Sequence, residues 1–183
     1  MKTSLILEPG LRAAAAKRFD REALPHLPSV YSTAFVMTGN AGEAEDLVKD
    51  AYARAWRNFD AVPSDRSVSV WLLRLLVGSF SDRQLSPWRA PIVIQAHFVD
   101  FDPTLLRDQL ESLSCDDVHD ALWSLPLELR LALWLVDREG LRYQEAADVM
   151  ETSKDAIASS LRIARGTMRK GLLERFRTKH CDY

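Results

Sequence analysis

The residues best suited to chemistry in this sequence are two cysteines and two histidines that form two close pairs. His119 lies four residues after Cys115, and His180 directly precedes Cys181. Four such side chains are in principle a zinc-ligand set, but the paired C-x-x-C or H-x-x-x-H spacing is absent, and a frayed terminus explains the second pair. The sequence also has no Gly-rich phosphate loop and no Ser/His/Asp order. We therefore expect no enzyme, no metal site, no cofactor and no disulfide framework.

A second pattern with chemical meaning lies near the C-terminus, where basic side chains lie on the second of two helix-like segments. Residues 143–150 and 153–176 are joined by a short turn, which makes 143–169 a helix-turn-helix candidate. With about 100 degrees per residue, an apolar cluster lies within roughly 60 degrees of Ile157 and would face a core. Its other members are Leu161, Ala164, Met168 and Leu172. The opposite, DNA-facing arc and its flanks hold Asp155, Ala158, Ser159, Arg162, Arg165, Arg169 and Lys170.

Helical periodicity dominates the rest of the chain, and only residues 90–94 look extended. The 183 residues are 47% hydrophobic and 27% charged, an ordinary globular composition. We expect helices over residues 11–38, 41–59 and 69–83, a short helix from about residue 116, and helices over residues 129–138, 143–150 and 153–176. Their apolar faces include Trp56, Trp71 and Val118. The pattern predicts an all-α protein of two small helical bundles joined by an acidic linker.

The charge distribution separates the same parts of the chain. Residues 1–90 hold 12 basic and 10 acidic side chains, residues 91–129 hold 1 and 8, and residues 130–183 hold 11 and 8. The acidic linker either lies in a basic channel of a partner or is simply solvated. No apolar run approaches the roughly 20 residues of a membrane span, and the apolar run in the first ten residues is too short for a signal peptide. We therefore expect a cytoplasmic protein without membrane insertion.

Several segments, taken together, resemble a known family. Residues 27–40, and residues 44–56 with the sequence AEDLVKDAYARAW, resemble region 2 of extracytoplasmic-function (ECF) sigma factors, where an AEDLVQETFLRAW-like helix is usual. Residues 70–74 (VWLLR), followed by Asp82 and Arg83, resemble the next helix of that region. Residues 125–130 and 137–147 resemble the opening of region 4. The resemblance covers about residues 24–84 and 118–173.

The resemblance implies a division of the chain and a set of partners. Residues 1–22 are expected to be an N-terminal extension, 23–84 a region 2-like bundle, 85–115 the linker, 116–177 a region 4-like helix-turn-helix domain and 178–183 a tail. The expected partners are core RNA polymerase, through its largest-subunit clamp helices and its flap, promoter DNA, and an anti-sigma factor. Such a protein directs promoter recognition and melting.

The resemblance also implies roles for individual residues. The helix at 43–57 would dock on the polymerase clamp helices through charged residues on one face, which are Asp46, Lys49, Asp50 and Arg54. The alternative is a solvated face with an internal Asp50–Arg54 ion pair, worth about 0.3–0.5 kcal/mol. Residues 63–83 would open the minus-ten element, with phosphates held by Arg66, Arg74 and Arg83, whereas Trp71 fits the core better. The second bundle would read the minus-thirty-five element through Ser153, Lys154, Ser159, Arg162, Arg165, Arg169 and Lys170.

Departures from the family pattern fall at the positions that would read DNA. Against the usual GTVKSRLxRAR helix, Ala158 and Ser160 replace a lysine and an arginine, and Glu151 replaces the turn glycine. Val77 and Gly78 replace an Arg-Asn pair. Two hypotheses follow: a working sigma factor with a divergent promoter, or a sigma-like protein that has lost promoter reading and acts by binding an anti-sigma factor or polymerase.

Overall fold

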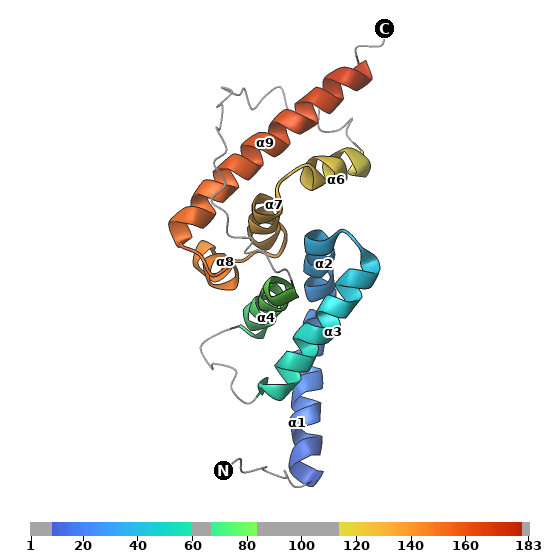
Figure 1. Cartoon of the computed structure of the whole chain (residues 1–183), viewed down its shortest axis with the longest axis vertical. Coiled ribbons are helices and arrows are strands. Elements are labelled where there is room, and N and C mark those ends of the chain that lie inside the picture. The colour runs from blue at the N-terminus through green and yellow to red at the C-terminus, as the bar shows by residue number, and fades with distance from the viewer. Residues whose placement is uncertain (1–8, 60–66, 84–113, 181–183) are drawn as a thin grey trace. The chain divides into compact units, whose positions relative to one another are not determined.

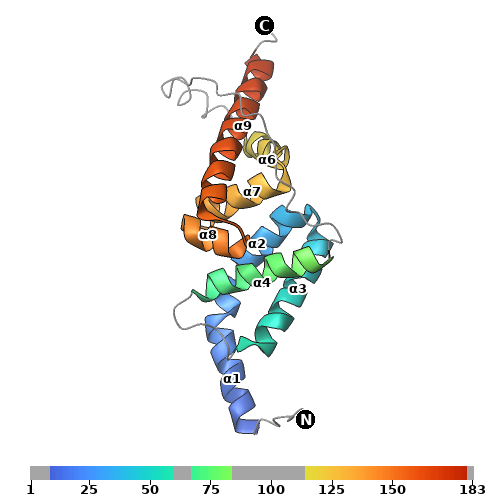
Figure 2. The same ribbon diagram turned by 60° about the vertical axis from the view of Figure 1, so that its left-hand side comes forward.

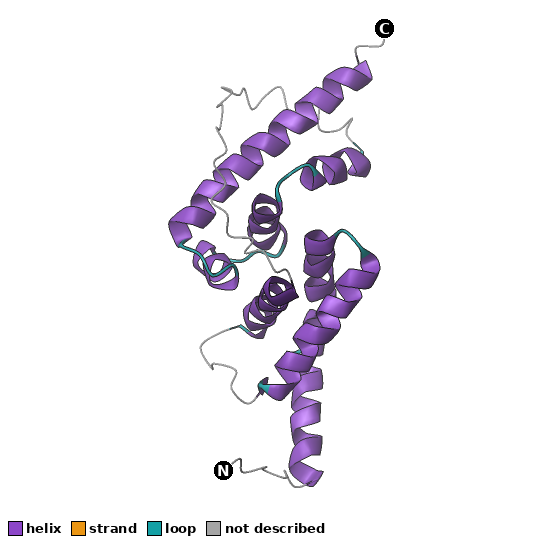
Figure 3. Cartoon of the chain, in the orientation of Figure 1, coloured by secondary structure: helices purple, strands orange, loops and turns teal. Residues whose placement is uncertain are grey.

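The structure, a computed structural model, describes residues 9–59, 67–83 and 114–180. All regular elements in these ranges are helical (Figure 3), which confirms the predicted all-α class. The chain divides into two compact units, Met1–Leu85 and Ser86–Tyr183. No helix among the described residues is long and apolar enough to cross a membrane. Each unit is described by itself below.

The first unit contains α1 (Pro9–Glu22), the 3-10 turn η1 (Leu24–His26), α2 (Leu27–Thr38), α3 (Ala41–Arg57) and α4 (Val68–Arg83). The prediction of one helix over residues 11–38 is wrong, because Pro25 and Pro28 lack the backbone N–H groups that would continue it. Each proline instead stands in the first turn of the next element, where no such donor is needed. The Tyr52 hydroxyl donates to the carbonyl oxygen of Ala23 at this break, at 3.0 Å.

The turn between α2 and α3 is formed by Gly39 and Asn40. Gly39 adopts a left-handed conformation with φ of 71°, and its N–H donates to the Phe35 carbonyl at 2.8 Å. The Asn40 side chain then caps α3 by accepting from the Glu43 N–H at 3.1 Å. This turn makes α2 and α3 neighbours, and α4 packs against both (Figure 2).

The core of the first unit is mostly aliphatic. Its fully buried large side chains are Val30, Leu47, Leu72, Leu73 and Leu76. The prediction that Trp56 belongs to the buried stripe of α3 is wrong, because 47% of that residue is exposed and one side of its ring meets Phe19. Trp71 is half-buried, with its ring centroid 6.2 Å from that of Phe59.

The second unit contains α6 (Cys115–Trp123), α7 (Leu127–Leu133), the π-helical turn η3 (Trp134–Arg138), α8 (Tyr143–Val149) and α9 (Lys154–His180). Helices α6, α7 and α8 all pack against α9 (Figure 1). The helix predicted over 129–138 begins earlier and changes to a π-turn at Trp134, whose carbonyl accepts from the Glu139 N–H at 3.0 Å. Val118, which the sequence places on the apolar face of α6, is 42% exposed.

Candidate functional site

Six charged residues of α3 and α4 form one surface of the first unit. This α3–α4 charged surface consists of Asp46, Lys49, Asp50, Arg54, Asp82 and Arg83. The charged side chains of α3 point outward, because the opposite face of the helix buries Leu47, Val48, Ala51 and Ala55 against the core. The four residues predicted to dock on a polymerase therefore do share a face.

Two ion pairs on this surface join α3 to α4, and Lys49 is paired within α3. The Asp50–Arg54 pair of the alternative interpretation does not form: Arg54 donates from Nη1 to Asp82 at 2.7 Å, and Asp50 accepts from Nε of Arg83 at 3.1 Å. Arg83 also donates from Nη2 to the backbone carbonyl of Asp46, at 2.9 Å. Within α3, Lys49 pairs with Asp46 at 3.1 Å. These partly exposed pairs are screened by water, so each contributes only about 0–1 kcal/mol to stability.

Of the three arginines predicted to hold minus-ten phosphates, the structure describes two, and these lie on different sides of α4. Arg66 lies outside the described residues. Arg74 is exposed on α4, and Arg83 follows nine residues later, which places the two roughly 180 degrees apart around the helix. Arg83 is directed at α3 instead, so its contacts differ from those expected of a phosphate-binding residue.

The predicted helix-turn-helix is formed by α8, residues 150–153 and α9. Glu151 adopts a positive φ of 49° in this turn, at the position where the family pattern has glycine. The Thr152 N–H donates to the Ala147 carbonyl at 2.9 Å, which ends α8. The Ser153 hydroxyl accepts from the Ala156 N–H at 3.1 Å, so Ser153 is the N-cap of α9.

The first three turns of α9 expose the arc that the periodicity predicts. Ile157, Leu161 and Ala164 are buried. The exposed residues are Lys154, Asp155, Ala158, Ser159 and Arg162. Arg169 and Lys170 are exposed further along, and the Lys170 ammonium lies 3.9 Å from the Glu174 carboxylate. The N-terminal part of α9 therefore offers a surface of the kind that enters a DNA groove.

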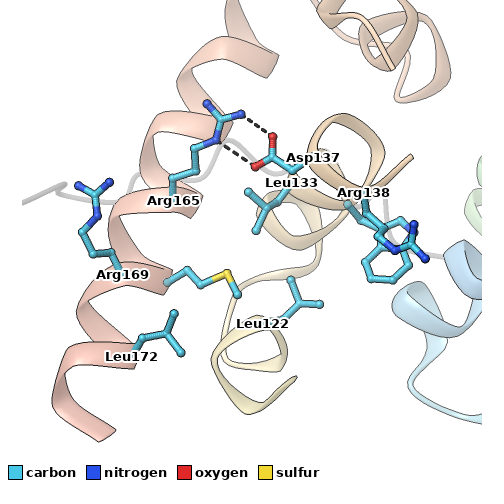
Figure 4. Close-up of a pocket in the computed structure, with 9 residues that line it drawn as sticks. Leu122, Leu133, Asp137, Arg138, Arg165, Arg169 and Leu172 are labelled. Carbon is cyan, nitrogen blue, oxygen red and sulfur yellow. Dashed lines mark hydrogen bonds and ion pairs between the residues drawn. The ribbon is translucent and has the colours of Figure 1, made fainter. Parts of the chain in front are cut away.

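Arg165, which was predicted to contact a phosphate, is held by a carboxylate of its own unit. Its guanidinium binds both carboxylate oxygens of Asp137 in η3, with Nε 3.1 Å from Oδ2 (Figure 4). The hydrogen bond with Asp137 raises the pKa of Arg165, and Tyr143, the first residue of α8, acts in the same direction. Arg165 thus links η3 to α9.

An apolar groove lies beside this ion pair, and the sequence did not predict it. Leu122, Leu133 and Leu172 line it, with Arg138, Arg165 and Arg169 among the charged residues at its edge (Figure 4). Met168 and Leu172, which were predicted to be core, are only half-buried and line this groove too. The apolar stripe of α9 continues past the buried Ala164 to Met168 and Leu172. This continuation is the sequence signal that could have indicated the groove.

The cysteine and histidine pairs give no metal site in the described part of the chain, where no group of three or more potential ligands occurs. Cys115 is exposed, and Nδ1 of His119 accepts a hydrogen bond from Nε1 of Trp123 at 3.2 Å. His180 ends α9, and Cys181 lies outside the described residues.

Comparison with known proteins agrees with this architecture. Residues 23–89 match the family described as sigma-70 region 2. The chain is 26% identical to the RNA polymerase sigma-H factor of Pseudomonas aeruginosa, with coverage of 85% of this chain and 86% of that protein. It is 29% identical to the ECF RNA polymerase sigma factor SigE of Mycolicibacterium smegmatis, over 85% of this chain and 62% of that protein, so it spans about three fifths of that relative's length.

A solved structure extends the similarity to three dimensions. The sigma factor RpoE of Bartonella quintana, in complex with the anti-sigma factor NepR, matches with a TM-score of 0.64 and 25% identity, over 86% of this chain and 98% of that one. The chain therefore shares the all-helical fold of this sigma factor. Over most of its length the chain is similar to RNA polymerase sigma factors, an ECF sigma factor among them.

Proposed function

We propose that this protein binds core RNA polymerase in the cytoplasm and directs promoter recognition and melting, without catalysing a reaction itself. The observation that carries the proposal is the presence, in one chain and in the family's order, of a region 2 match and a helix-turn-helix. The relatives that match both parts are RNA polymerase sigma factors. In this proposal residues 23–84 dock on the polymerase clamp helices, and residues 116–177 read upstream DNA.

The α9 arc supports the DNA-reading part of the proposal. Ser159 and Arg162 are exposed in its first turns, where a recognition helix meets base edges. Ala158, also exposed, is small enough to meet a thymine methyl group. Ser153 and Lys154 stand at the start of the helix, where phosphates are commonly bound. Arg169 and Lys170 would contact the backbone further along.

The groove of the second unit supports a protein partner for that unit. Its apolar floor and charged edge suit an amphipathic segment that buries one face. We assign it to a docking element of the polymerase flap or of an anti-sigma factor, which would then compete for one surface. The RpoE relative forms a complex with an anti-sigma factor, and an equivalent regulator for this chain is part of the proposal.

The second candidate function is that of a sigma-like protein that binds polymerase or an anti-sigma factor without reading promoters. Two observations favour it. Ala158 and Ser160 stand where the family pattern has basic residues. Arg83 and Arg165, two of the arginines expected to meet DNA, are engaged with Asp50 and Asp137 instead.

Holoenzyme assembly followed by permanganate footprinting on the DNA upstream of the protein's own gene separates the two functions. The proposed function predicts a stable complex with core polymerase and reactive, unpaired thymines near minus ten. Arg162→Ala should abolish the footprint and leave assembly intact. Assembly without melting, together with melting after Ala158→Lys and Ser160→Arg are introduced, would favour the second function. Failure of the wild-type chain to bind core polymerase would contradict the proposal.

A further inference from the structure

Two neighbouring residues at the end of α4 reach across to α3 with opposite charges. Asp82 accepts a hydrogen bond from Arg54 at 2.7 Å, whereas Arg83 donates one to Asp50 at 3.1 Å. Asp50 and Arg54 are four residues apart and so lie one turn apart on the same side of α3. The end of α4 therefore meets two consecutive turns of α3 with complementary charges.

These pairs remain accessible to a partner. The side chains of Arg54 and Asp82 are 39% and 63% exposed, and those of Arg83 and Asp50 are 40% and 51% exposed. The second hydrogen bond of Arg83, to the carbonyl of Asp46, anchors the guanidinium to the backbone one turn before Asp50. The charged groups of α3 are thus held in fixed places while half of each side chain still faces solvent.

We infer that Asp82 and Arg83 are positioning residues of the polymerase-docking surface, because they hold Arg54 and Asp50 in place on α3. The inference rests on the proposed function, since it concerns how the same surface meets polymerase. A long charged side chain loses rotamer freedom when it binds a partner. A side chain that is already held by an ion pair within its own protein loses less of this freedom. The partner that fits is a helical surface with acidic and basic side chains in complementary places.

The role of Arg83 in this inference differs from the phosphate contact that the family resemblance implies. Its place about 180 degrees from Arg74 around α4 means that the two cannot serve one phosphate-binding face of that helix. Two of its three nitrogen atoms, Nε and Nη2, already donate to α3.

The test is a fluorescence titration of the labelled full-length chain with core polymerase in the absence of DNA. Asp82→Asn and Arg83→Gln should each weaken binding by on the order of five- to tenfold. Lys17→Gln and Asp20→Asn, which remove exposed charges of the same kinds from α1, serve as matched controls and should bind as wild type. Thermal unfolding of each variant shows whether the fold is retained.

Double variants distinguish positioning from a purely structural role. If Asp82 acts through Arg54, Asp82→Asn should add no further loss of polymerase affinity in an Arg54→Ala background. Arg83→Gln should likewise add none in an Asp50→Ala background. A lowered melting temperature with unchanged polymerase affinity, or losses that are fully additive in both backgrounds, would overturn the inference.

A DNA measurement separates the two roles of Arg83. In preformed holoenzyme, Arg83→Gln should leave the salt dependence of promoter binding unchanged. If Arg83→Gln lowers the slope of log promoter affinity against log salt by about 0.9 and leaves polymerase affinity normal, Arg83 contacts a DNA phosphate and the inference is overturned. If instead the wild-type chain itself does not bind core polymerase, it is the proposed function that fails.

Discussion

The ion pair between Arg165 and Asp137 makes a quantitative prediction about DNA binding. An arginine that contacts a phosphate releases a counterion and adds about 0.9 to the slope of log affinity against log salt. Between 50 and 200 mM salt, this corresponds to roughly a 3.5-fold loss of affinity for each contact. Arg165 is bound to both carboxylate oxygens of Asp137, whereas Arg162 is exposed on the arc proposed to face DNA.

We therefore expect Arg162→Gln to lower the slope by about 0.9 and Arg165→Gln to leave it unchanged. Asp137→Asn should raise the slope, by up to about 0.9, because it frees the Arg165 charge for the DNA backbone. The assay is promoter binding by the holoenzyme, measured by fluorescence anisotropy at four or more salt concentrations.

Arg175→Gln provides the matched control, since this arginine of α9 also pairs with a carboxylate, Asp120, at 2.9 Å. It should leave the slope unchanged. If Arg165→Gln lowers the slope as much as Arg162→Gln does, then Arg165 leaves Asp137 for a phosphate when DNA binds, and the prediction is wrong.

Three further predictions concern stability. Glu151→Gly should stabilise the chain against urea by about 0.5–1 kcal/mol, because it relieves a residue at φ of 49°; Glu151→Ala should give no such gain, and equal effects would contradict the explanation. Gly166→Ala should stabilise α9 by about 0.8–1 kcal/mol, since an added Cβ meets no atom; a lower urea midpoint would count against this. Tyr52→Phe should cost about 1 kcal/mol through the lost bond to Ala23. Burial raises the pKa of Tyr52 to about 12. The contribution of the neutral hydroxyl to the free energy of unfolding is therefore complete below pH 10 and is lost as the pH rises to 12. Tyr52→Phe should not show this loss of stability.

Helices with a continuous apolar stripe were predictable from the sequence. The periodicity around Ile157 identified the exposed arc of α9 because a regular helix repeats its faces every 3.6 residues. The same reasoning merged α1 and α2, since the apolar spacing continues through Pro25 and Pro28 although the backbone hydrogen bonds do not. Periodicity reports which face is apolar, and it does not report where the hydrogen-bonding pattern is interrupted.

The ion pairs of the site could not be predicted in this way. Arg83 and Asp50 are 33 residues apart, and Arg165 and Asp137 are 28 apart, whereas patterns along one helix reach only three or four residues. These pairs depend on how two helices cross, which local sequence does not determine. The groove was missed for the same reason, because its floor combines side chains of α6, α7 and α9.

Run-off transcription with purified core polymerase, on the DNA upstream of the protein's own gene, tests whether the protein directs initiation. One discrete transcript should require the protein and should disappear with Arg162→Ala, which is expected to bind polymerase normally. If the protein assembles with polymerase and no promoter sequence ever gives a transcript, the claim that it directs initiation is contradicted.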